Sequence, residues 1–379
     1  MKKRVVIIGS GFSGFYAARK LAKFKKEIDL IVIDKRDTFD FLPLLPDVIG
    51  RNINPQILSN SIRQISRKFG FNFIKDEVIS IELENNVVQT LSKKITYDYL
   101  IISSGSETNF YGNEGIRKFV YPVNNVRDME KIMESLKSKE YDHYFISGAG
   151  YTGVEVATNL KRYFNKHKIQ KDIVIIEKAP GILGSLPEWM KKYVADNLAK
   201  LNINILVNAS LDKIDLDSIV LSSGQSFNKA FVFWVSGVKT AGFIQNLSVE
   251  KNPQGRIKVD AYLKITPNCF VVGDCAFIAY KDSFLRMAVQ FSIYEALCAA
   301  ENIERAIKGK KLKIYKPLDM GYIIPMANNK SCGQVMGIDF KGFLPTLMHF
   351  VMCVYRLNGF KNKIGLIKAL VKGGFKWQT

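Results

Sequence analysis

Residues 5–14, VVIIGSGFSG, constrain the fold more than any other stretch of the chain. Four consecutive β-branched apolar residues predict a buried parallel strand, and the glycines lead directly into YAARKLAKF, which predicts a helix. In such a unit Gly9 permits the sharp turn, Gly11 lets the backbone approach a pyrophosphate, and Gly14 lets the helix pack on the strand. The next strand ends at Asp34, at the spacing of a carboxylate that binds a ribose hydroxyl. This stretch therefore predicts a dinucleotide-binding α/β unit.

The same pattern recurs in the middle of the chain. Residues 143–160, HYFISGAGYTGVEVATNL, again predict a strand, a glycine turn and a helix, with glycines at Gly148, Gly150 and Gly153. The following strand ends at Glu177. A carboxylate at this position accepts a hydrogen bond from the 2′-hydroxyl of NADH and repels the 2′-phosphate of NADPH, so NADH is expected. Two such units predict two bound dinucleotides; the alternative is that the second unit is a relic with an empty cleft.

The charge and the cysteines narrow the class of protein. A formal net charge of +20 suggests nucleic acid, an anionic membrane surface or anionic ligands as partners. Nucleic acid is not expected, because the chain has no zinc-ligand spacing, helix-turn-helix or RNA-binding signature. The five cysteines form no CxxC pair, and their odd number argues against a disulfide framework. The chain also has no run of 18 apolar residues, so a membrane-spanning helix is not expected.

Three further segments complete the outline. Residues 39–50, FDFLPLLPDVIG, are rich in aromatic residues and proline and predict a loop that contacts another part of the molecule. Residues 57–70 predict a helix. Residues 265–276, ITPNCFVVGDCA, predict a short strand that ends at Gly273 and Asp274, before a helix over 285–308. A carboxylate at that strand end suits a ribitol hydroxyl of a flavin.

The order of these motifs resembles that of a known flavoprotein family. ISSG at 102–105, VFWVSGVK at 232–239 and VQFSIYEALCAAENI at 289–303 fall between and after the two fingerprints. Together they are similar to the two-dinucleotide-binding-domain flavoproteins of the pyridine nucleotide-disulfide oxidoreductase fold, and within these to the type II NADH:quinone oxidoreductases, from end to end. The resemblance implies an α/β fold of two Rossmann-like domains with a C-terminal amphipathic membrane-binding helical tail. Its predicted parts are an FAD-binding domain (1–111 and 257–320), an NAD-binding domain (112–256) and a membrane-anchoring or dimer region (321–379).

The resemblance also implies which residues hold FAD, non-covalently, in the first domain. Asp34 and Lys35 would lie at the adenosine ribose. Val78 would contact adenine through its backbone, and Asp274 would hold the ribitol chain. The remaining cofactor-binding residues implied for FAD are Gly9, Ser10, Gly11, Phe12, Ser13, Gly14, Ser104, Gly105 and Gly273.

NADH would bind in the second domain, where Glu177 matches the acid at the ribose and Glu155 the acid that approaches the nicotinamide. The backbone contacts would come from Gly148, Gly150, Gly153 and Gly237. Hydride transfer from NADH to the flavin needs no side-chain nucleophile. Glutathione-reductase-like members of the fold carry a CxxxxC pair, and residues 39–70 contain no cysteine. Disulfide reductases are therefore excluded.

The resemblance further implies that quinone reaches the flavin through a tunnel whose walls carry an Ala-Gln-x-x-x-Gln pattern. Here Val289 and Gln290 replace Ala-Gln, and Tyr294 replaces the second Gln, with Glu295 next to it. Lys330 matches a family lysine beside the flavin and the tunnel. Quinol formation needs protons, which Glu155 or Glu295 would relay because an apolar site raises the pKa of a carboxyl. The alternative for Glu295 is a solvated position on the outer helix face.

The C-terminal tail carries a separate signal. From residue 341 to residue 379 there are seven basic residues and no acid. The segment KNKIGLIKALVKGGFKW predicts a basic amphipathic helix with Phe375 and Trp377 at its end, which is typical of attachment to an anionic leaflet. Residues 342–377 therefore predict a monotopic, peripheral protein on the cytoplasmic face of the cell membrane. A homodimer is also expected, and the alternative for the tail is a dimer-interface or core helix.

Three other functions stay open at this point. A sulfide:quinone oxidoreductase would use Cys275 or Cys332 to carry sulfur. A soluble NADH-dependent reductase would pass electrons to an acidic carrier protein, and a non-catalytic flavoprotein would bind NADH as a sensor. The three histidines are scattered and predict no metal site; they are interpreted as structural or surface residues (His143, His167 and His349). The main prediction is a non-proton-pumping NADH:quinone oxidoreductase of a respiratory chain.

Overall fold

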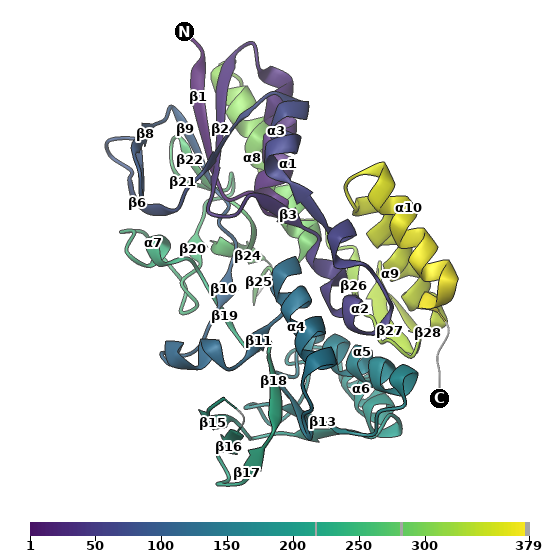
Figure 1. The fold of residues 1–379 in the computed structure, drawn as a ribbon. Coiled ribbons are helices and arrows are strands. Elements are labelled where there is room, and N and C mark those ends of the chain that lie inside the picture. Colours follow the sequence, from purple (N-terminus) through teal and green to yellow (C-terminus); the bar gives the residue numbers. More distant parts are fainter. Residues whose placement is uncertain (217, 281–282, 376–379) are drawn as a thin grey trace. The chain divides into compact units, whose positions relative to one another are not determined.

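The computed structural model describes residues 1–216, 218–280 and 283–375, which form two compact units (Figure 1). Unit 1 comprises Met1–Phe39, Asn60–Glu107 and Val238–Asp319. Unit 2 comprises Asp40–Ser59, Thr108–Gly237 and the chain from Met320 onward. The boundaries of the three predicted regions remain predictions.

Unit 1 is built on a sheet with strand order β21-β22-β9-β1-β2-β5, parallel except for β21 against β22. Val5 lies opposite Leu30 on one side and Tyr99 on the other. Both faces of β1 are covered, which explains why its last four residues are all apolar and buried. The strands are β1 (Lys3–Ile8), β2 (Ile28–Asp34), β5 (Asn72–Lys75), β9 (Tyr99–Ile102), β21 (Lys264–Thr266) and β22 (Cys269–Val271).

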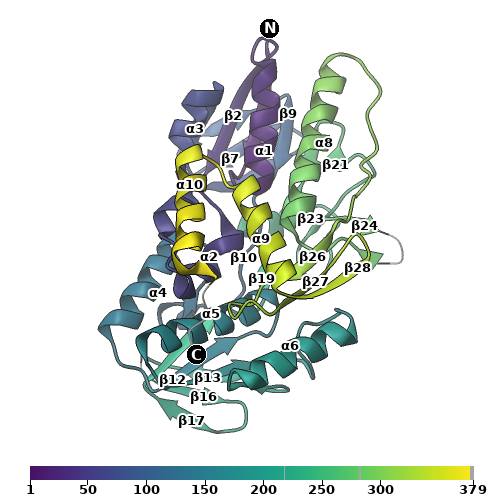
Figure 2. The ribbon, with the colours of Figure 1, turned by 90° about the vertical axis from the view of Figure 1, so that its right-hand side faces the viewer.

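Helices α1 (Phe12–Leu21) and α8 (Val289–Ile307) pack side by side in unit 1 (Figures 1 and 2). They bring the glycine turn after β1 near the turn after β22, which positions the first candidate site. The other helices are η1 (Ala22–Phe24), α3 (Ile62–Phe69), α7 (Gly242–Gln245) and η5 (Gly273–Cys275). The smaller sheets contain β6 (Val78–Glu82), β7 (Val87–Thr90), β8 (Lys94–Thr96), β20 (Ile257–Lys258), β23 (Ala276–Phe277), β24 (Ala279–Tyr280) and β25 (Ser283–Phe284).

Unit 2 repeats this plan with the parallel sheet β11-β18-β12-β13-β14. Its strands are β11 (Tyr121–Pro122), β12 (His143–Ser147), β13 (Asp172–Ile176), β14 (Ile203–Leu206) and β18 (Ala230–Trp234). Its helices are η2 (Leu42–Leu44), α2 (Leu45–Gly50), η3 (Pro55–Leu58), η4 (Glu114–Lys118), α4 (Val126–Ser138), α5 (Tyr151–His167) and α6 (Glu188–Lys200). The antiparallel strands β15 (Leu211–Ile214), β16 (Ser218–Leu221) and β17 (Ser226–Asn228) form a small sheet.

The end of the chain adds a second antiparallel sheet and two helices to unit 2. Strands β26 (Gly321–Ile324), β27 (Ser331–Val335) and β28 (Ile338–Gly342) lead into α9 (Phe343–Arg356) and α10 (Phe360–Ala369), which ends in the π-helix η6 (Leu370–Gly374). Helices α9 and α10 lie side by side (Figures 1 and 2). Within the described part of the chain, every helix is too short or too polar to cross a membrane. Short strands lie where the sequence passes from one unit to the other: β3 (Thr38–Asp40), β4 (Ser59–Ser61), β10 (Glu107–Thr108) and β19 (Val238–Lys239).

The structure corrects three of the predicted segments. The loop predicted over 39–50 contains helix α2, because its prolines lie at the first turns of η2 and α2, where a missing N–H costs little. The helix predicted over 57–70 begins only at Ile62, where the side chain of Ser61 accepts a hydrogen bond from Gln64 N–H. The helix predicted over 285–308 begins at Val289.

Candidate dinucleotide-binding sites

In the glycine turn after β1, no side chain covers the backbone at Gly11, just before α1. Gly9 has φ +94° and its N–H donates to Ile33 O over 2.8 Å. A Cβ on Gly14 would lie 1.8 Å from the carbonyl oxygen of Gly9, so only glycine fits there. A Cβ on Gly11 would meet no heavy atom within 4 Å. The backbone at the start of α1 therefore has free space beside it, as an anion-binding helix terminus requires.

The carboxylate of Asp34 is fixed beside this turn. Its Oδ2 accepts hydrogen bonds from the N–H and the hydroxyl of Ser10, both at 2.7 Å, and its Oδ1 accepts one from Arg36 N–H at 2.8 Å. The next residue, Lys35, forms ion pairs with Glu77 and Glu107. Asp34 is thus buried and oriented by the glycine turn, whereas Lys35 lies on the surface.

Gly273 and Asp274 lie at the end of β22, as predicted. Gly273 has φ +77°, and a Cβ on it would lie 2.4 Å from Ser13 Oγ. Asp274 Oδ2 accepts a hydrogen bond from Ser106 Oγ at 2.9 Å, and burial raises the pKa of Asp274. Gly105 has φ +68° and open space where a Cβ would be. Unit 1 therefore brings the two glycine turns and the two aspartates to the same ends of its parallel strands.

The remaining residues predicted for FAD belong to the same unit. Phe12 is the first residue of α1 and is buried, with its ring 5.3 Å from that of Phe39. Ser104 follows β9, and Val78 is the first residue of β6 and is buried.

Helix α8 carries the four residues predicted for the quinone tunnel. Val289 is its first residue. Gln290 is buried, and its amide donates to Asp319 Oδ1 over 3.1 Å. Tyr294 is half-buried and packs against the hydrophobic core of unit 1. Gln290 and Tyr294 therefore lie on well-packed parts of the helix.

Glu295 lies on the inner side of α8, so the solvated outer position considered for it is wrong. Only 3% of the residue is exposed, and its Oε2 accepts a hydrogen bond from Gly273 N–H at 2.6 Å. Burial raises the pKa of Glu295 to about 7, and Asp274 adds to this, whereas the Gly273 hydrogen bond and Arg256 act in the opposite direction. The side chain therefore connects α8 to the strand end that carries Asp274.

The glycine turn after β12 in unit 2 has the same geometry as the first. Gly148 has φ +110°, and a Cβ on Gly153 would lie 2.0 Å from the carbonyl oxygen of Gly148. A Cβ on Gly150 would again meet nothing within 4 Å. Glu177 accepts hydrogen bonds from Ala149 N–H at 2.8 Å and from Ala179 N–H at 2.9 Å. Its carboxylate is thus oriented by the turn, as Asp34 is in unit 1.

Tyr111 is a residue of this second site that the sequence motifs did not reveal. Gly237 has φ +70°, and a Cβ on it would lie 2.0 Å from Tyr111 Oη. Tyr111 itself has φ +51° and is largely exposed. Burial of its hydroxyl and the nearby charge of Glu177 raise its pKa. Its exposed ring lies against Gly237, and no pattern in the surrounding FYGNEG segment indicates this.

Glu155 lies on α5, two residues after Gly153, next to a charged cluster that the sequence also did not reveal. Loss of hydration raises the pKa of Glu155 to about 8; Asp47 adds to the effect and His349 opposes it. Asp47 accepts a hydrogen bond from Arg51 Nε at 2.8 Å. His349, interpreted from the sequence as a structural or surface residue, is therefore part of this cluster.

Lys330 is exposed in the turn between β26 and β27 in unit 2.

The cysteines have the properties of packing residues. Cys275 is fully buried, with Sγ 3.3 Å from Val272 O, and burial raises its thiol pKa to about 11. Cys332 is also fully buried, and burial raises its pKa to about 12. A cysteine that carries sulfur must react as a thiolate. With their pKa values raised, both thiols stay protonated near neutral pH.

Comparison with known proteins identifies the family. The family model described as pyridine nucleotide-disulphide oxidoreductase matches residues 3–303. The chain belongs to this family. A type II NADH:quinone oxidoreductase from Staphylococcus saprophyticus is 24% identical over 405 aligned residues, covering 99% of each chain.

Two solved structures share the fold of this chain. NDH2 from Plasmodium falciparum, in complex with NADH, matches with a TM-score of 0.84 at 20% identity, covering 100% of this chain and 99% of that one. A sulfide:quinone oxidoreductase from Aquifex aeolicus matches with a TM-score of 0.78 at 21% identity, covering 96% and 92%. The predicted membership of the pyridine nucleotide-disulphide oxidoreductase family and the predicted α/β fold class are thus confirmed.

Proposed function

We propose that this protein is an FAD-dependent NADH:quinone oxidoreductase of type II that does not pump protons. The observation that carries the proposal is the presence of two dinucleotide-binding glycine turns in one chain. Each has open space at its central glycine, Gly11 or Gly150. The relative from Staphylococcus saprophyticus, aligned over nearly its whole length, carries the same activity in its name. FAD, when bound, would supply the two-electron chemistry, accepting hydride from NADH and passing two electrons to quinone.

The residues of unit 1 fit FAD. Open space at Gly11 and Gly105 leaves room for a ligand along the backbone, where a side chain would fill it. The N–H groups at the start of α1 would bind the pyrophosphate. Asp34 and Lys35 would hold the adenosine ribose, Val78 would contact adenine, and Asp274 would bond to the ribitol chain.

The residues of unit 2 fit NADH. Open space at Gly150 leaves room for the pyrophosphate, and both oxygens of Glu177 are oriented by backbone N–H groups. An acceptor carboxylate favours the 2′-hydroxyl of NADH over the 2′-phosphate of NADPH. Gly237 would lie along the dinucleotide, and Glu155 would approach the nicotinamide.

For the second half-reaction, the proposed quinone-tunnel residues are Val289, Gln290, Tyr294 and Glu295, and Lys330 matches the family lysine that lies beside the flavin. Quinone takes up protons together with electrons, so a carboxyl that holds a proton near neutral pH is useful. Glu155, with its pKa raised to about 8, and Glu295, with its pKa raised to about 7, both have this property. The proposed role of each is to donate a proton to the reduced acceptor.

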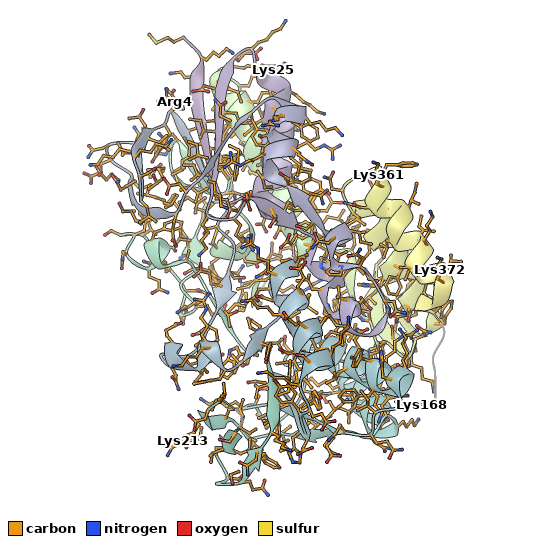
Figure 3. All side chains as sticks on the ribbon, in the orientation of Figure 1. Arg4, Lys25, Lys168, Lys213, Lys361 and Lys372 are labelled. Carbon is orange, nitrogen blue, oxygen red and sulfur yellow. The ribbon has the colours of Figure 1, made fainter. Side chains whose placement is uncertain are left out.

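The C-terminal helices support a further part of the proposal, peripheral attachment to the cytoplasmic face of an anionic cell membrane. Lys361 and Lys372 extend along the outer side of these helices (Figure 3). Each basic residue near such a surface contributes about 1 kcal/mol. Of the two predicted end residues, Phe375 and Trp377, only Phe375 lies within the described part of the chain, and the basic residue Lys376 also lies outside it. The segment from α9 to η6 also carries exposed apolar residues: Phe343, Leu344, Leu347, Val351, Tyr355, Phe360, Ile364, Ile367 and Val371.

The membrane proposal has its own test, flotation with vesicles that contain or lack anionic lipid. The variant K361E/K372E should lose binding to anionic vesicles. K168E/K213E changes the same number of exposed lysines elsewhere in unit 2 and should bind as the wild type does. Equal loss in both variants would indicate a general charge effect and contradict the proposal. A homodimer through the same tail is the remaining part of the proposal, and sedimentation of the detergent-solubilised protein tests it.

The test of the catalytic proposal is anaerobic stopped-flow spectroscopy of the flavin-loaded protein, with NADH, NADPH and sulfide as separate donors. NADH should bleach the flavin rapidly, NADPH should do so much more slowly, and sulfide should have no effect. Mixing the reduced enzyme with a quinone should restore the flavin absorbance. Bleaching by sulfide alone would favour a sulfide:quinone oxidoreductase, and reoxidation only by a carrier protein would favour a soluble reductase.

A further inference from the structure

We propose that Asp47 and His349 form a proton-supply pair that reprotonates Glu155 during quinone reduction. The proposal rests on the proposed function, because it concerns the proton that the reaction consumes. Oxidation of NADH by quinone takes one proton from solvent per turnover, to give NAD⁺ and quinol. Glu155 would donate this proton, His349 would restore it, and water would recharge His349.

Asp47 and Glu155 belong to two helices of unit 2 that are in close contact. A Cβ on Gly50 would lie 2.6 Å from the carbonyl oxygen of Asn159, so α2 and α5 pack backbone against backbone at this point. Asp47 precedes Gly50 by about one helical turn, and Glu155 precedes Asn159 by about one turn. Asp47 is buried, and its charge acts on the carboxyl of Glu155.

His349 comes from a third element, the C-terminal helix α9. Its Nε2 lies 3.9 Å from Asp47 Oδ2 and 3.6 Å from Cys353 Sγ. The neighbouring residues Thr346, Phe350 and Cys353 are buried, so His349 lies on the inner side of the helix. About 12% of its side chain is still exposed, which leaves the imidazole a route to water. A histidine in this position can exchange a proton with solvent and also interact with a buried carboxylate.

Two arginines complete the cluster and are too strongly held to move protons. Arg51 donates to Asp47 and to the carbonyl oxygens of Met326 and Ala327, with Phe350 stacked 4.8 Å from its guanidinium carbon. Arg162 on α5 donates to the carbonyl oxygens of Gly50, Ala327 and Gly373. Arginine stays charged in proteins. The titratable and charged groups of the cluster are thus Asp47 on α2 and Arg51 directly after it, Glu155 and Arg162 on α5, and His349 and Cys353 on α9.

The charges determine which groups carry the mobile protons. Burial raises the pKa of Glu155 to about 8, so its carboxyl is protonated near neutral pH. Burial alone would lower the pKa of His349, but Cys353 and Asp47 outweigh it and raise that pKa well above the ordinary value. The adjacent imidazole of His349 and the ion pair and hydrogen bond with Arg51 outweigh burial at Asp47 and lower its pKa, so it stays ionised. Glu155 and His349 each hold one proton, and Asp47 compensates the charge of the imidazolium.

The proposed step is a single proton transfer at each stage. The carboxyl of Glu155 releases its proton to the reduced acceptor and becomes a carboxylate. The imidazolium of His349 then loses its proton to this carboxylate, and the neutral imidazole takes one from water. No electron moves in these steps, and the net uptake is the one proton that quinone reduction requires.

The experiment compares an acceptor that takes a proton with one that does not. The variant H349Q is assayed with a short-chain quinone and with ferricyanide, a one-electron acceptor that binds no proton. H349Q should lower kcat with quinone on the order of 100-fold, the usual effect of losing a general acid. Its ferricyanide rate and the rate of flavin bleaching by NADH should stay within twofold of the wild type, and added imidazole should restore part of the quinone rate. The control H167Q makes the same change at an exposed histidine of unit 2 and should leave both rates unchanged.

A second measurement needs no variant. The wild-type quinone rate should fall as the pH rises through about 8, where Glu155 loses its proton, and the ferricyanide rate should not follow this profile. Equal losses of H349Q with both acceptors would indicate a structural role and overturn the proposal, as would unchanged rates or identical pH profiles. These outcomes differ from a failure of the proposed function itself. In that case NADH would not bleach the flavin of the wild-type protein, or quinone would not reoxidise it.

Discussion

Replacement of Gly150 by alanine separates nucleotide binding from folding in the second fingerprint. Gly150 has φ −76° and ψ −169°, which alanine adopts without strain, and its Cβ would meet nothing within 4 Å. G150A should therefore change the free energy of unfolding by less than about 1 kcal/mol. With NADH bound, the added methyl group would occupy the space of the close backbone approach. Overpacking of this kind costs about 1–3 kcal/mol, which corresponds to a rise in KM for NADH of about 5- to 150-fold.

The matched control is G153A, in the same turn. Its Cβ would lie 2.0 Å from the backbone oxygen of Gly148, which cannot move away easily. G153A should lower the midpoint of thermal unfolding, whereas G150A should leave it nearly unchanged. The assay is the steady-state rate against NADH concentration, with calorimetry on the same samples. A G150A protein with unchanged KM, or with stability lowered as much as that of G153A, would refute the assignment of this turn to NADH.

Three further predictions follow from buried groups. Burial raises the pKa of Glu295 to about 7, so the folded state binds its proton more tightly than the unfolded state, and the free energy of unfolding should fall by up to about 3 kcal/mol as pH rises from about 4.5 to 7. E295Q should flatten this dependence in urea titrations at pH 5 and 8, and an unchanged slope would show that the carboxyl does not titrate there. R162M removes the Arg162 donor from the carbonyl oxygens of Gly50 and Gly373 and one of the two donors from that of Ala327, so it should cost about 3 kcal/mol of stability by chemical denaturation; a loss below 1 kcal/mol would contradict this. Iodoacetamide at pH 7.5 should leave Cys275 unlabelled in peptide maps and NADH oxidation intact, because its thiol is buried with a pKa of about 11. Labelling of Cys275 with loss of activity would point to sulfur chemistry instead.

The parts of the sites that could be predicted from the sequence are those set by the backbone conformation and close packing of a few neighbouring glycines. Gly9 and Gly148 require positive φ, and Gly14 and Gly153 permit no side chain, so a short pattern of residues contains the whole requirement. The carboxylates that orient these turns come from the next strand, which the alternation of strand and helix already indicates. Such features are readable because a few neighbouring residues determine them.

The buried charges could not be predicted in this way. Asp47, Glu155 and His349 are far apart in the sequence and come together only because α2, α5 and α9 pack in one unit. Proline at 46 indicated a loop, whereas it begins a helix. Tyr111 lies against Gly237, and no motif in the sequence around Tyr111 indicates this contact. Tertiary packing, rather than local propensity, decides all of these positions.

The two fingerprints also show where chemistry can be added to a repeated scaffold. Each turn uses its first and third glycines and one carboxylate for the same backbone task, so the fold itself requires those positions. Two residues after the third glycine, α1 carries Tyr16, which packs against the core of unit 1. The corresponding residue of α5 is Glu155, with its pKa raised by burial. The scaffold does not dictate this position, and the difference between the two residues fits the proposed roles: the first unit would only hold its dinucleotide, whereas the second would also donate a proton.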